Sequence, residues 1–386
     1  MTPVKMGFMT PYSSIYPHFA SHLTVGFYLG LDQDPRNNTD VEFVPDYAGT
    51  GSLTEVEGVA KKLLQFNNVD ILSGMINYRA LPNLLPLVSN WNKMAFFFDM
   101  GELMPPSDTL GRDFYFNSLQ LYQSQYALGY WAQKEFKNPG QIVMPIYNSG
   151  FILNTAFQQG LSAAGGKTLL QSVIQYKVDD PHHLNIDPIM ETIRKENPAF
   201  VHALFVGPQG NEFLEKWKAE SWTKGIPLLL AENMLYEDML GDVANLGLEL
   251  YGATSWNSAS EEKHNQLFTR KFKELTGQDA NIYALLGYET GLLFKEWIPV
   301  LKKKDWDLLR ECFAKSEIQT PRGVRRFTHD KLLQRPEIDI IKVKCQNNMI
   351  NRFVIDRGET MADANGLPNP IDADLDSGWV NPYLCI

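Results

Sequence analysis

The sequence predicts an α/β protein of two doubly wound lobes, each with a parallel central sheet covered by helices on both faces. Apolar segments such as residues 69–74 and 93–101 alternate with amphipathic helical segments along most of the chain. Strands that are apolar throughout, without polar alternation, are typical of parallel sheets buried on both faces. The pattern restarts after residues 113–119 with no Ser/Gly-rich linker, so we expect two lobes joined by short crossovers.

The first set of elements begins with a strand at residues 4–11, followed by a helix and a second strand at residues 41–49. The next helix is predicted to begin near Thr54, because Thr54 and Glu57 have the spacing of a capping box. A third strand ends at Gly74, where the missing side chain would let a small molecule approach the backbone.

The second set of elements repeats this order. Its predicted strands lie at residues 141–150, 168–176, 199–207, 226–233 and 248–256. A long helical region at residues 261–301 and a turn-rich, hairpin-like segment from Thr320 come next. Residues 362–379 are rich in turn formers and are expected to form an ordered surface wrap.

Composition and motifs exclude several classes of function. The 386 residues carry a net charge of −10, so no basic surface for nucleic acid is expected. No apolar run reaches the ~18 residues of a membrane span. Neither HExxH, nor G-x-S-x-G, nor a Walker A loop is present in the sequence, and no enzyme, metal or cofactor is expected.

The three cysteines leave the redox compartment open. Cys345 and Cys385 are the pair to test for a disulfide, and Cys312 would then be the remaining thiol. Three reduced thiols fit the sequence equally well. No cysteine has the spacing of a metal site.

Polar and aromatic residues gather just past the carboxyl ends of the predicted strands. Open parallel sheets bind ligands at that edge, so these residues predict a ligand cleft between the two lobes. The candidates after first-lobe strands are Tyr12, Tyr16, Tyr78, Arg79, Asp99 and Met100. Those after second-lobe strands are Ser149, Phe151, Gly207 and Glu232.

The order of these segments resembles the type I periplasmic binding proteins, and more narrowly the branched-chain amino acid and amide receptors of ABC transporters. The matching segments include "VKMGFMTPYS", "VEFVPDYAGTGSLTEVEGVAKKLL", "VDILSGMINYRALPNLLPLV", "LTGQDANIYALLGYETGLLF" and "IQTPRGVRRFTHDKLL". No single motif is specific, but their order and spacing together cover nearly the whole chain.

The resemblance implies a two-lobed clamp of the Venus flytrap type, with three crossovers, that closes over a small solute and delivers it to a membrane permease. Lobe 1 would comprise residues 1–118 plus 252–330, and lobe 2 residues 119–251 plus 331–386. The protein would act in the periplasm or outside the cell, with its export signal absent from this chain. A cytoplasmic amide or amino acid sensor of the same fold is the alternative, and a hydrolase is the less favoured one.

The family's ligand contacts carry over unevenly. Tyr78 occupies the position of a small hydroxyl residue, Asp99 and Met100 replace a small residue and a threonine, and Ser149 replaces a tyrosine. Glu232 matches the acidic residue that accepts the ligand's ammonium group. The ammonium side of an amino acid site is thus retained, whereas its carboxylate side is altered.

The altered carboxylate side of the site affects which charge the ligand is expected to carry. Burying a ligand carboxylate beside Asp99 would cost several kcal/mol. Arg79 could offset that cost if its side chain turns inward, although a solvated position at the helix start is the more ordinary one. Otherwise the cleft favours a neutral amide or a cationic amine, with aromatic side chains such as Tyr12 and Phe151 as walls.

Overall fold

The computed structural model describes residues 2–13, 15–37, 40–101, 111–137, 139–145, 148–167, 169–175, 177–179, 183–328, 334 and 337–361, with the backbone alone at 148–151.

The chain divides into two compact units. The first contains the described residues between Met1 and Leu119 and between Asn257 and Pro336. The second contains those between Gln120 and Trp256 and between Glu337 and Leu367. The expected wrap at 362–379 and the partner proposed for Cys345 lie outside the described residues.

A five-stranded parallel sheet in the order β2-β1-β3-β4-β5 forms the centre of the first unit. Its strands are β1 (Val4–Thr10), β2 (Val41–Tyr47), β3 (Ile71–Gly74), β4 (Met94–Asp99) and β5 (Phe114–Ser118). The winding direction of the chain reverses between β1 and β3. The carboxyl ends of two such strands are the usual ligand position in open α/β sheets.

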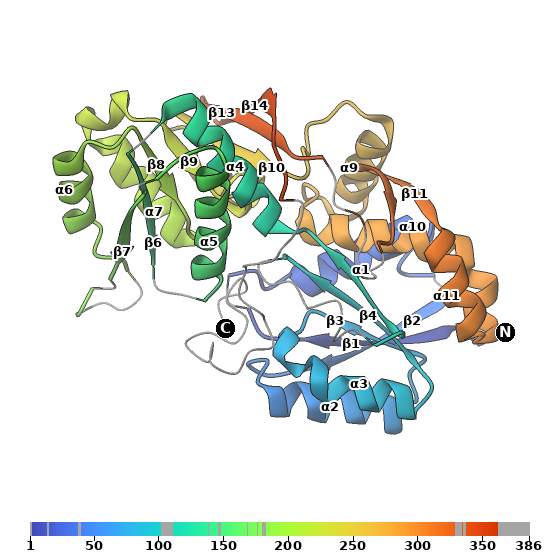
Figure 1. Cartoon of the computed structure of the whole chain (residues 1–386). Helices are drawn as coiled ribbons and strands as arrows, with labels where there is room; N and C mark the ends of the chain where they lie inside the picture. The colour runs from blue at the N-terminus through green and yellow to red at the C-terminus, as the bar shows by residue number, and fades with distance from the viewer. Residues whose placement is uncertain are drawn as a thin grey trace. The chain divides into compact units, whose positions relative to one another are not determined.

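Helices cover both faces of this sheet. Figure 1 shows α2 (Leu53–Gln65) and α3 (Leu81–Asn90) on one face, and α1 (Phe19–Gly30) and α10 (Ile282–Lys303) on the other. Successive side chains of β4 point to opposite faces of the sheet, as strand geometry requires. Phe97 joins the apolar cluster of α2 and α3, whereas the Phe96 ring lies 5.4 Å from that of Phe294 in α10. The unit also contains η1 (Tyr78–Ala80), α9 (Lys263–Thr276), α11 (Trp306–Lys315), β11 (Glu317–Thr320) and β12 (Gly323–Arg326).

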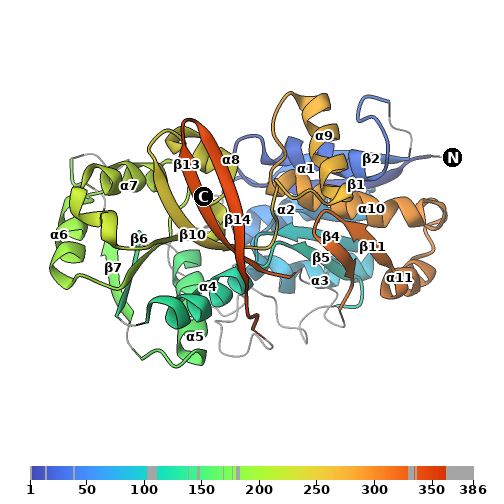
Figure 2. The same ribbon diagram turned by 90° about the horizontal axis from the view of Figure 1, so that it is seen from above.

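The second unit contains a seven-stranded sheet in the order β14-β13-β10-β9-β8-β6-β7. Its strands are β6 (Gly140–Pro145), β7 (Leu169–Ile174), β8 (Phe200–Ala203), β9 (Leu228–Leu230), β10 (Leu248–Thr254), β13 (Asp339–Gln346) and β14 (Met349–Arg357). The first five are parallel, and β13 and β14 extend the sheet from β10 as an antiparallel ribbon, visible in Figure 2. Its parallel part repeats the winding of the first unit, because β6 lies between β7 and β8.

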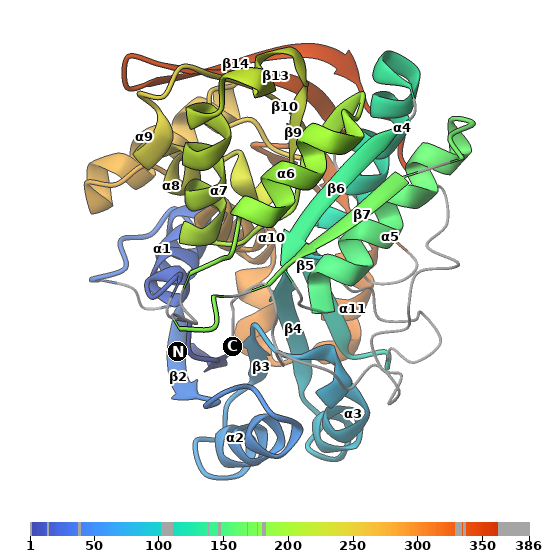
Figure 3. The ribbon, with the colours of Figure 1, turned by 90° about the vertical axis from the view of Figure 1, so that its left-hand side faces the viewer.

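The helices of the second unit also lie on two faces (Figure 3). One face carries α4 (Leu121–Phe136) and α5 (Asn148–Ala163), and the other carries α6 (Asp187–Glu196) and α7 (Pro208–Ala219). The short elements α8 (Glu237–Leu240), η3 (Ser221–Gly225), η4 (Glu232–Met234) and η5 (Gly241–Val243) follow α7. The predicted α/β fold with parallel central sheets is therefore confirmed.

One local prediction needs correction. The capping box of α2 is formed by Ser52 and Glu55, not by Thr54 and Glu57. Ser52 has extended backbone angles, so its hydroxyl faces the Glu55 N–H, whereas Thr54 already lies inside the helix. Gly74 also has a packing requirement of its own: at φ 138°, a Cβ would lie 2.1 Å from the Met9 carbonyl oxygen of the neighbouring strand.

Candidate functional site

A buried carboxylate, Glu232, lies at the carboxyl edge of the second sheet. It begins η4, separated from the end of β9 by one residue, and the adjacent parallel strand β10 ends at Thr254 beside it. Parallel neighbours end at the same edge, which brings Glu232 close to the residues after β10. Its side chain is 0% exposed. This position matches the sequence prediction that Glu232 follows a strand end.

The two oxygens of Glu232 have different surroundings. Oε1 accepts hydrogen bonds from the Tyr236 hydroxyl at 2.6 Å and from the Ser255 N–H and hydroxyl, both at 2.7 Å. The Thr254 hydroxyl adds a longer one at 3.4 Å. Oε2 is buried and has no hydrogen-bond partner among the described residues. An oriented carboxylate with one unfilled oxygen can accept a hydrogen bond from a ligand.

A second carboxyl, the half-buried Asp99, ends β4 in the first unit. The Ser118 hydroxyl of β5 donates to its Oδ1 at 2.5 Å, and the described residues offer Oδ2 no partner. Burial raises the pKa of Asp99 to about 7, although the hydrogen bonds from Ser118 and the Gly101 backbone act in the opposite direction. The carboxyl therefore changes its protonation near neutral pH, so it can both donate and accept hydrogen bonds.

Tyr78 and Arg79 begin the 3-10 turn η1 that follows β3. Asn77 caps this turn, accepting from the Arg79 N–H at 3.0 Å. Tyr78 is 4% exposed and its ring packs edge-on against Phe116 at 5.2 Å, inside the apolar cluster beneath α2 and α3. Its hydroxyl is buried without a hydrogen-bond partner in the described part of the chain. Arg79 is partly buried.

The other first-unit candidates occupy different surroundings. Tyr12 lies in the loop after β1 and is 56% exposed, while its N–H donates to the Gly49 carbonyl at 3.0 Å. Tyr16 is half-buried, with its ring 5.4 Å from that of Tyr283. Met100 follows Asp99 and is buried. Only Tyr12 has a largely exposed side chain, so the candidates do not form one uniform surface.

Two helix starts carry the remaining second-unit candidates. Ser149 and Phe151 lie in the first turn of α5, and their side chains are outside the described part. Gly207 precedes α7 with φ 64° and ψ −152°, a conformation that strongly favours glycine. Pro208 follows as the first residue of α7, where its lack of an N–H costs no helical hydrogen bond.

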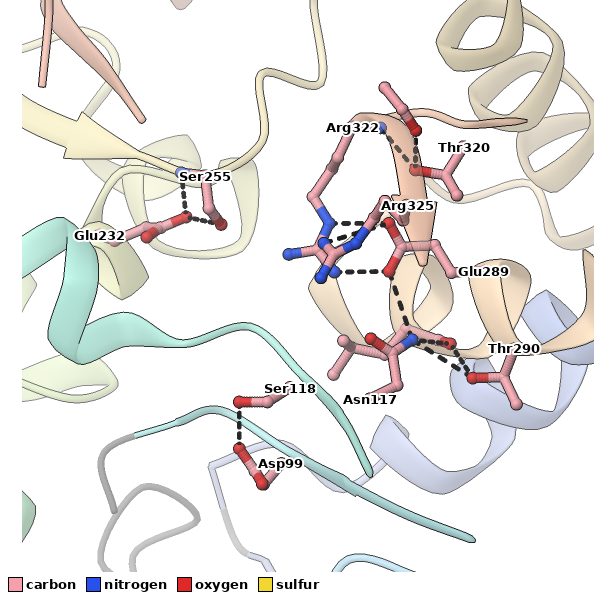
Figure 4. A network of polar contacts seen from close by, with 12 residues as sticks. Asp99, Asn117, Ser118, Glu232, Ser255, Glu289, Thr290, Thr320, Arg322 and Arg325 are labelled. Atoms are coloured by element: carbon pink, nitrogen blue, oxygen red, sulfur yellow. Dashed lines mark hydrogen bonds and ion pairs between the residues drawn. The ribbon is translucent and has the colours of Figure 1, made fainter. Parts of the chain in front are cut away.

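The sequence analysis missed a buried ion-pair cluster in the first unit (Figure 4). Glu289 of α10 accepts from Arg322 Nε at 2.8 Å and Arg322 Nη2 at 2.5 Å. Arg325 Nη1 lies 3.8 Å from Glu289 Oε1, and Asn117 Nδ2 lies 3.3 Å from Oε2. Burial disfavours the ionised form of Glu289, but the two guanidinium groups outweigh it and lower its pKa. Burial and the nearby Arg322 lower the pKa of Arg325 to about 9.

A signal for this cluster was present in the sequence. Glu289 interrupts the largely apolar helical stretch at 282–294, and a charged residue in such a stretch needs a buried partner. Among the described residues, no group of three or more His, Cys, Asp or Glu side chains is arranged to hold a metal ion. No helix in the described ranges is long and apolar enough to cross a membrane.

Several solved structures are similar to this chain. An ABC transporter substrate-binding protein from Sphaerobacter thermophilus has a TM-score of 0.77 at 16% identity, covering 92% of this chain and 97% of that chain. A solute binding protein of an ABC transporter from Rhodopseudomonas palustris, in complex with p-hydroxybenzoic acid, has a TM-score of 0.74 at 15% identity, covering 92% and 96%. A branched chain amino acid ABC transporter periplasmic ligand-binding protein from Burkholderia xenovorans has a TM-score of 0.70 at 16% identity, covering 92% and 95%.

At these identities, the structural likeness shows the fold. A comparison with curated proteins finds no match. The sequence pattern of the periplasmic binding protein family matches residues 3–344. That match covers most of the chain and confirms the predicted resemblance and the prediction of a binding protein rather than an enzyme. The chain belongs to the periplasmic binding protein family.

Proposed function

We propose that this protein is the substrate-binding receptor of an ABC transporter, and that it recognises its ligand through a group that donates a hydrogen bond to Glu232. The unfilled Oε2 oxygen of Glu232 is the observation that carries this proposal. An exported receptor in the periplasm or outside the cell, working with a membrane permease, fits the family.

An amino group is the donor that suits Glu232 best. A buried acceptor without a partner costs roughly 1–3 kcal/mol, and more when it is charged. Tyr236 and Ser255 direct their donors to Oε1, and Glu232 forms no ion pair with a described Lys or Arg. A ligand ammonium would supply both the missing donor and the opposite charge. An amino acid or a related nitrogen compound is therefore the proposed ligand.

A hydroxylated aromatic acid is the second candidate. The Rhodopseudomonas palustris structure is a complex with p-hydroxybenzoic acid, and a phenolic hydroxyl is also a donor that Glu232 Oε2 could accept. The two candidates differ in charge at this contact. Ammonium binding should weaken strongly when Glu232 loses its charge, whereas phenol binding should weaken less.

The residues after the first-unit strands are the further candidate contacts. Tyr78 and Asp99 each hold a buried polar atom without a described partner. Arg79 is partly buried beside Tyr78, and Tyr12 offers an exposed ring after β1. These positions stay predictions until a ligand is known.

A thermal-shift screen of amino acids, amides, amines and aromatic acids tests the proposal. A ligand at about 100 times its Kd should stabilise the native state by about 2.7 kcal/mol, which is a shift of a few °C. Leucine and 4-hydroxybenzoate represent the two candidate classes. No shift with any member of the panel would contradict the proposal.

The decisive variant is Glu232→Gln, with Glu215→Gln as its matched control. Glu215 lies on the exposed side of α7 in the same unit, so it undergoes the same change in charge outside the site. We expect Glu232→Gln to weaken binding about tenfold to hundredfold, as for the loss of a hydrogen bond to a charged group. Unchanged affinity in this variant would show that Glu232 does not contact the ligand.

A further inference from the structure

The β11–β12 hairpin holds a buried arginine in a fixed orientation. Arg322 lies in the two-residue turn between these strands. Thr320 fixes the turn, since its hydroxyl accepts from the Arg322 N–H at 3.1 Å and donates to the Gly323 carbonyl at 2.9 Å. Gly323 has φ 88°, which favours glycine at that position. Arg322 is 9% exposed as a residue and 0% in its side chain.

The guanidinium of Arg322 uses only one edge for the ion pair. Its Nε and Nη2 donate to the two carboxylate oxygens of Glu289, which is the bidentate arrangement that fits a carboxylate. This geometry turns Nη1 away from the carboxylate. Nη1 is buried and finds no hydrogen-bond partner in the described part of the chain, although it carries two N–H donors.

Glu289 cannot also satisfy Nη1. Its oxygens already face Arg322, Asn117 Nδ2 at 3.3 Å and Arg325 Nη1 at 3.8 Å. Within the described cluster, one carboxylate therefore faces two guanidinium groups (Figure 4). A purely structural ion pair is stable when its remaining donors are satisfied as well. Here the remaining donors are suited to an acceptor that carries negative charge.

We propose that Arg322 Nη1 binds the acid group of the ligand. This inference rests on the proposed function, because it assigns the acid group to the solute that the receptor carries. It narrows the ligand to a carboxylic acid, such as an amino acid or an aromatic acid, rather than a neutral amide or a simple amine. The altered carboxylate contacts at Asp99 and Met100 are then replaced by a guanidinium from a different segment of the chain.

Pairs of probes that differ only in the acid group test this assignment. The pairs are leucine with leucinamide and 4-hydroxybenzoate with 4-hydroxybenzamide, measured by calorimetric titration of the whole chain. In the pair whose acid binds, we expect the wild-type protein to bind the acid about tenfold to hundredfold more tightly than the amide. Equal or tighter binding of the amide would overturn the assignment without any variant.

Arg322→Lys is the informative variant, because it keeps the charge beside Glu289 and removes the fork of N–H donors. We expect the preference for the acid to fall to about twofold or less, with binding of the amide unchanged. Arg326→Lys is the matched control, since Arg326 is an exposed residue on β12 of the same hairpin. An unchanged preference in a folded Arg322→Lys protein would indicate that water alone fills the Nη1 position.

The same titrations separate this inference from the proposed role of Glu232. Acid binding that is weakened by Arg322→Lys but not by Glu232→Gln would support the contact between Arg322 and the acid group. It would overturn the contact between Glu232 and the ligand. The opposite pattern would overturn the contact between Arg322 and the acid group and leave the Glu232 contact in place. Binding of amines or amides alone would also overturn the Arg322 contact. If no probe bound, that result would count against both the Arg322 contact and the Glu232 contact.

Discussion

Glu232 and Glu289 are both fully buried carboxylates, yet the protein treats them in opposite ways. Glu289 has two guanidinium groups and an amide beside it, which engage both of its oxygens. Glu232 has only neutral donors, all directed to one oxygen, and the other oxygen is left open among the described residues. Burial alone therefore does not identify a ligand contact. The distribution of donors over the two oxygens does.

The largest change in unfolding free energy should come from removing the carboxylate of Glu289, which is paired with arginines. Glu289→Gln leaves Arg322 and Arg325 buried without their counter-charge, and breaking a buried pair in this way costs about 3–5 kcal/mol of unfolding free energy. Chemical denaturation of the ligand-free protein measures it. Glu296→Gln, at an exposed position of the same helix, is the control. A loss below about 1 kcal/mol would show that the cluster is not held by this carboxylate.

Asp99 extends the comparison to a half-buried carboxyl that has two hydrogen-bond donors, Ser118 and the Gly101 backbone, and no cation among the causes of its pKa shift. Its pKa is raised to about 7 by burial, so the folded state binds a proton that the unfolded chain releases near its ordinary pKa of 3.8. The resulting stability is fully present below about pH 4 and is lost as the pH rises towards 7. We expect a contribution on the order of 2–3 kcal/mol, seen as a fall in unfolding free energy over this range.

Asp99→Asn should flatten that part of the stability profile, because the amide does not titrate. The measurement is urea denaturation of the wild-type and Asp99→Asn proteins without ligand at pH 4, 5.5 and 7, so that the other titrating groups are the same in both. A profile that keeps the same slope in Asp99→Asn would assign the titration to another residue.

Tyr78 offers an unpaired buried hydroxyl within an apolar cluster rather than at a charged position. Tyr78→Phe keeps the ring against Phe116 and removes only the hydroxyl. If that hydroxyl contacts the ligand, affinity should fall by about 1 kcal/mol, or roughly fivefold, while the ligand-free protein is not destabilised. Tyr78→Ser would also remove the ring and should cost several kcal/mol of stability, as for other large-to-small core substitutions. Unchanged affinity in Tyr78→Phe would make Tyr78 a core residue.

The sequence predicted the fold well because the fold depends on patterns that are local in the chain. Uniformly apolar strands such as residues 94–98 require helices on both faces of the sheet, and this pattern repeats in both units. The capping box of α2 was misplaced by two residues, since Ser52 and Thr54 are both acceptable caps followed three residues later by glutamate. Only backbone angles distinguish them.

The candidate site was predictable only in part. Glu232 could be found because it directly follows a strand, and strand ends meet at one edge of a parallel sheet. Arg322 could not be paired with Glu289 by this rule, because the two residues come from a hairpin and a helix 33 positions apart. The sequence does not show which edge of a guanidinium is left open. That information exists only in the three-dimensional arrangement of the donors.

Glu232→Gln in the absence of ligand should have the smallest effect and gives the sharpest contrast with Glu289→Gln. The glutamine keeps an acceptor for Tyr236 and Ser255 and removes a buried negative charge, but it places an amide N–H₂ where Oε2 was open. These changes largely offset one another, so we expect the unfolding free energy to stay within about 1 kcal/mol of the wild-type value. Denaturation of both variants under one set of conditions makes the comparison direct. A loss as large as that of Glu289→Gln would mean that the charge of Glu232 holds the fold together, and its open oxygen would then need a structural explanation.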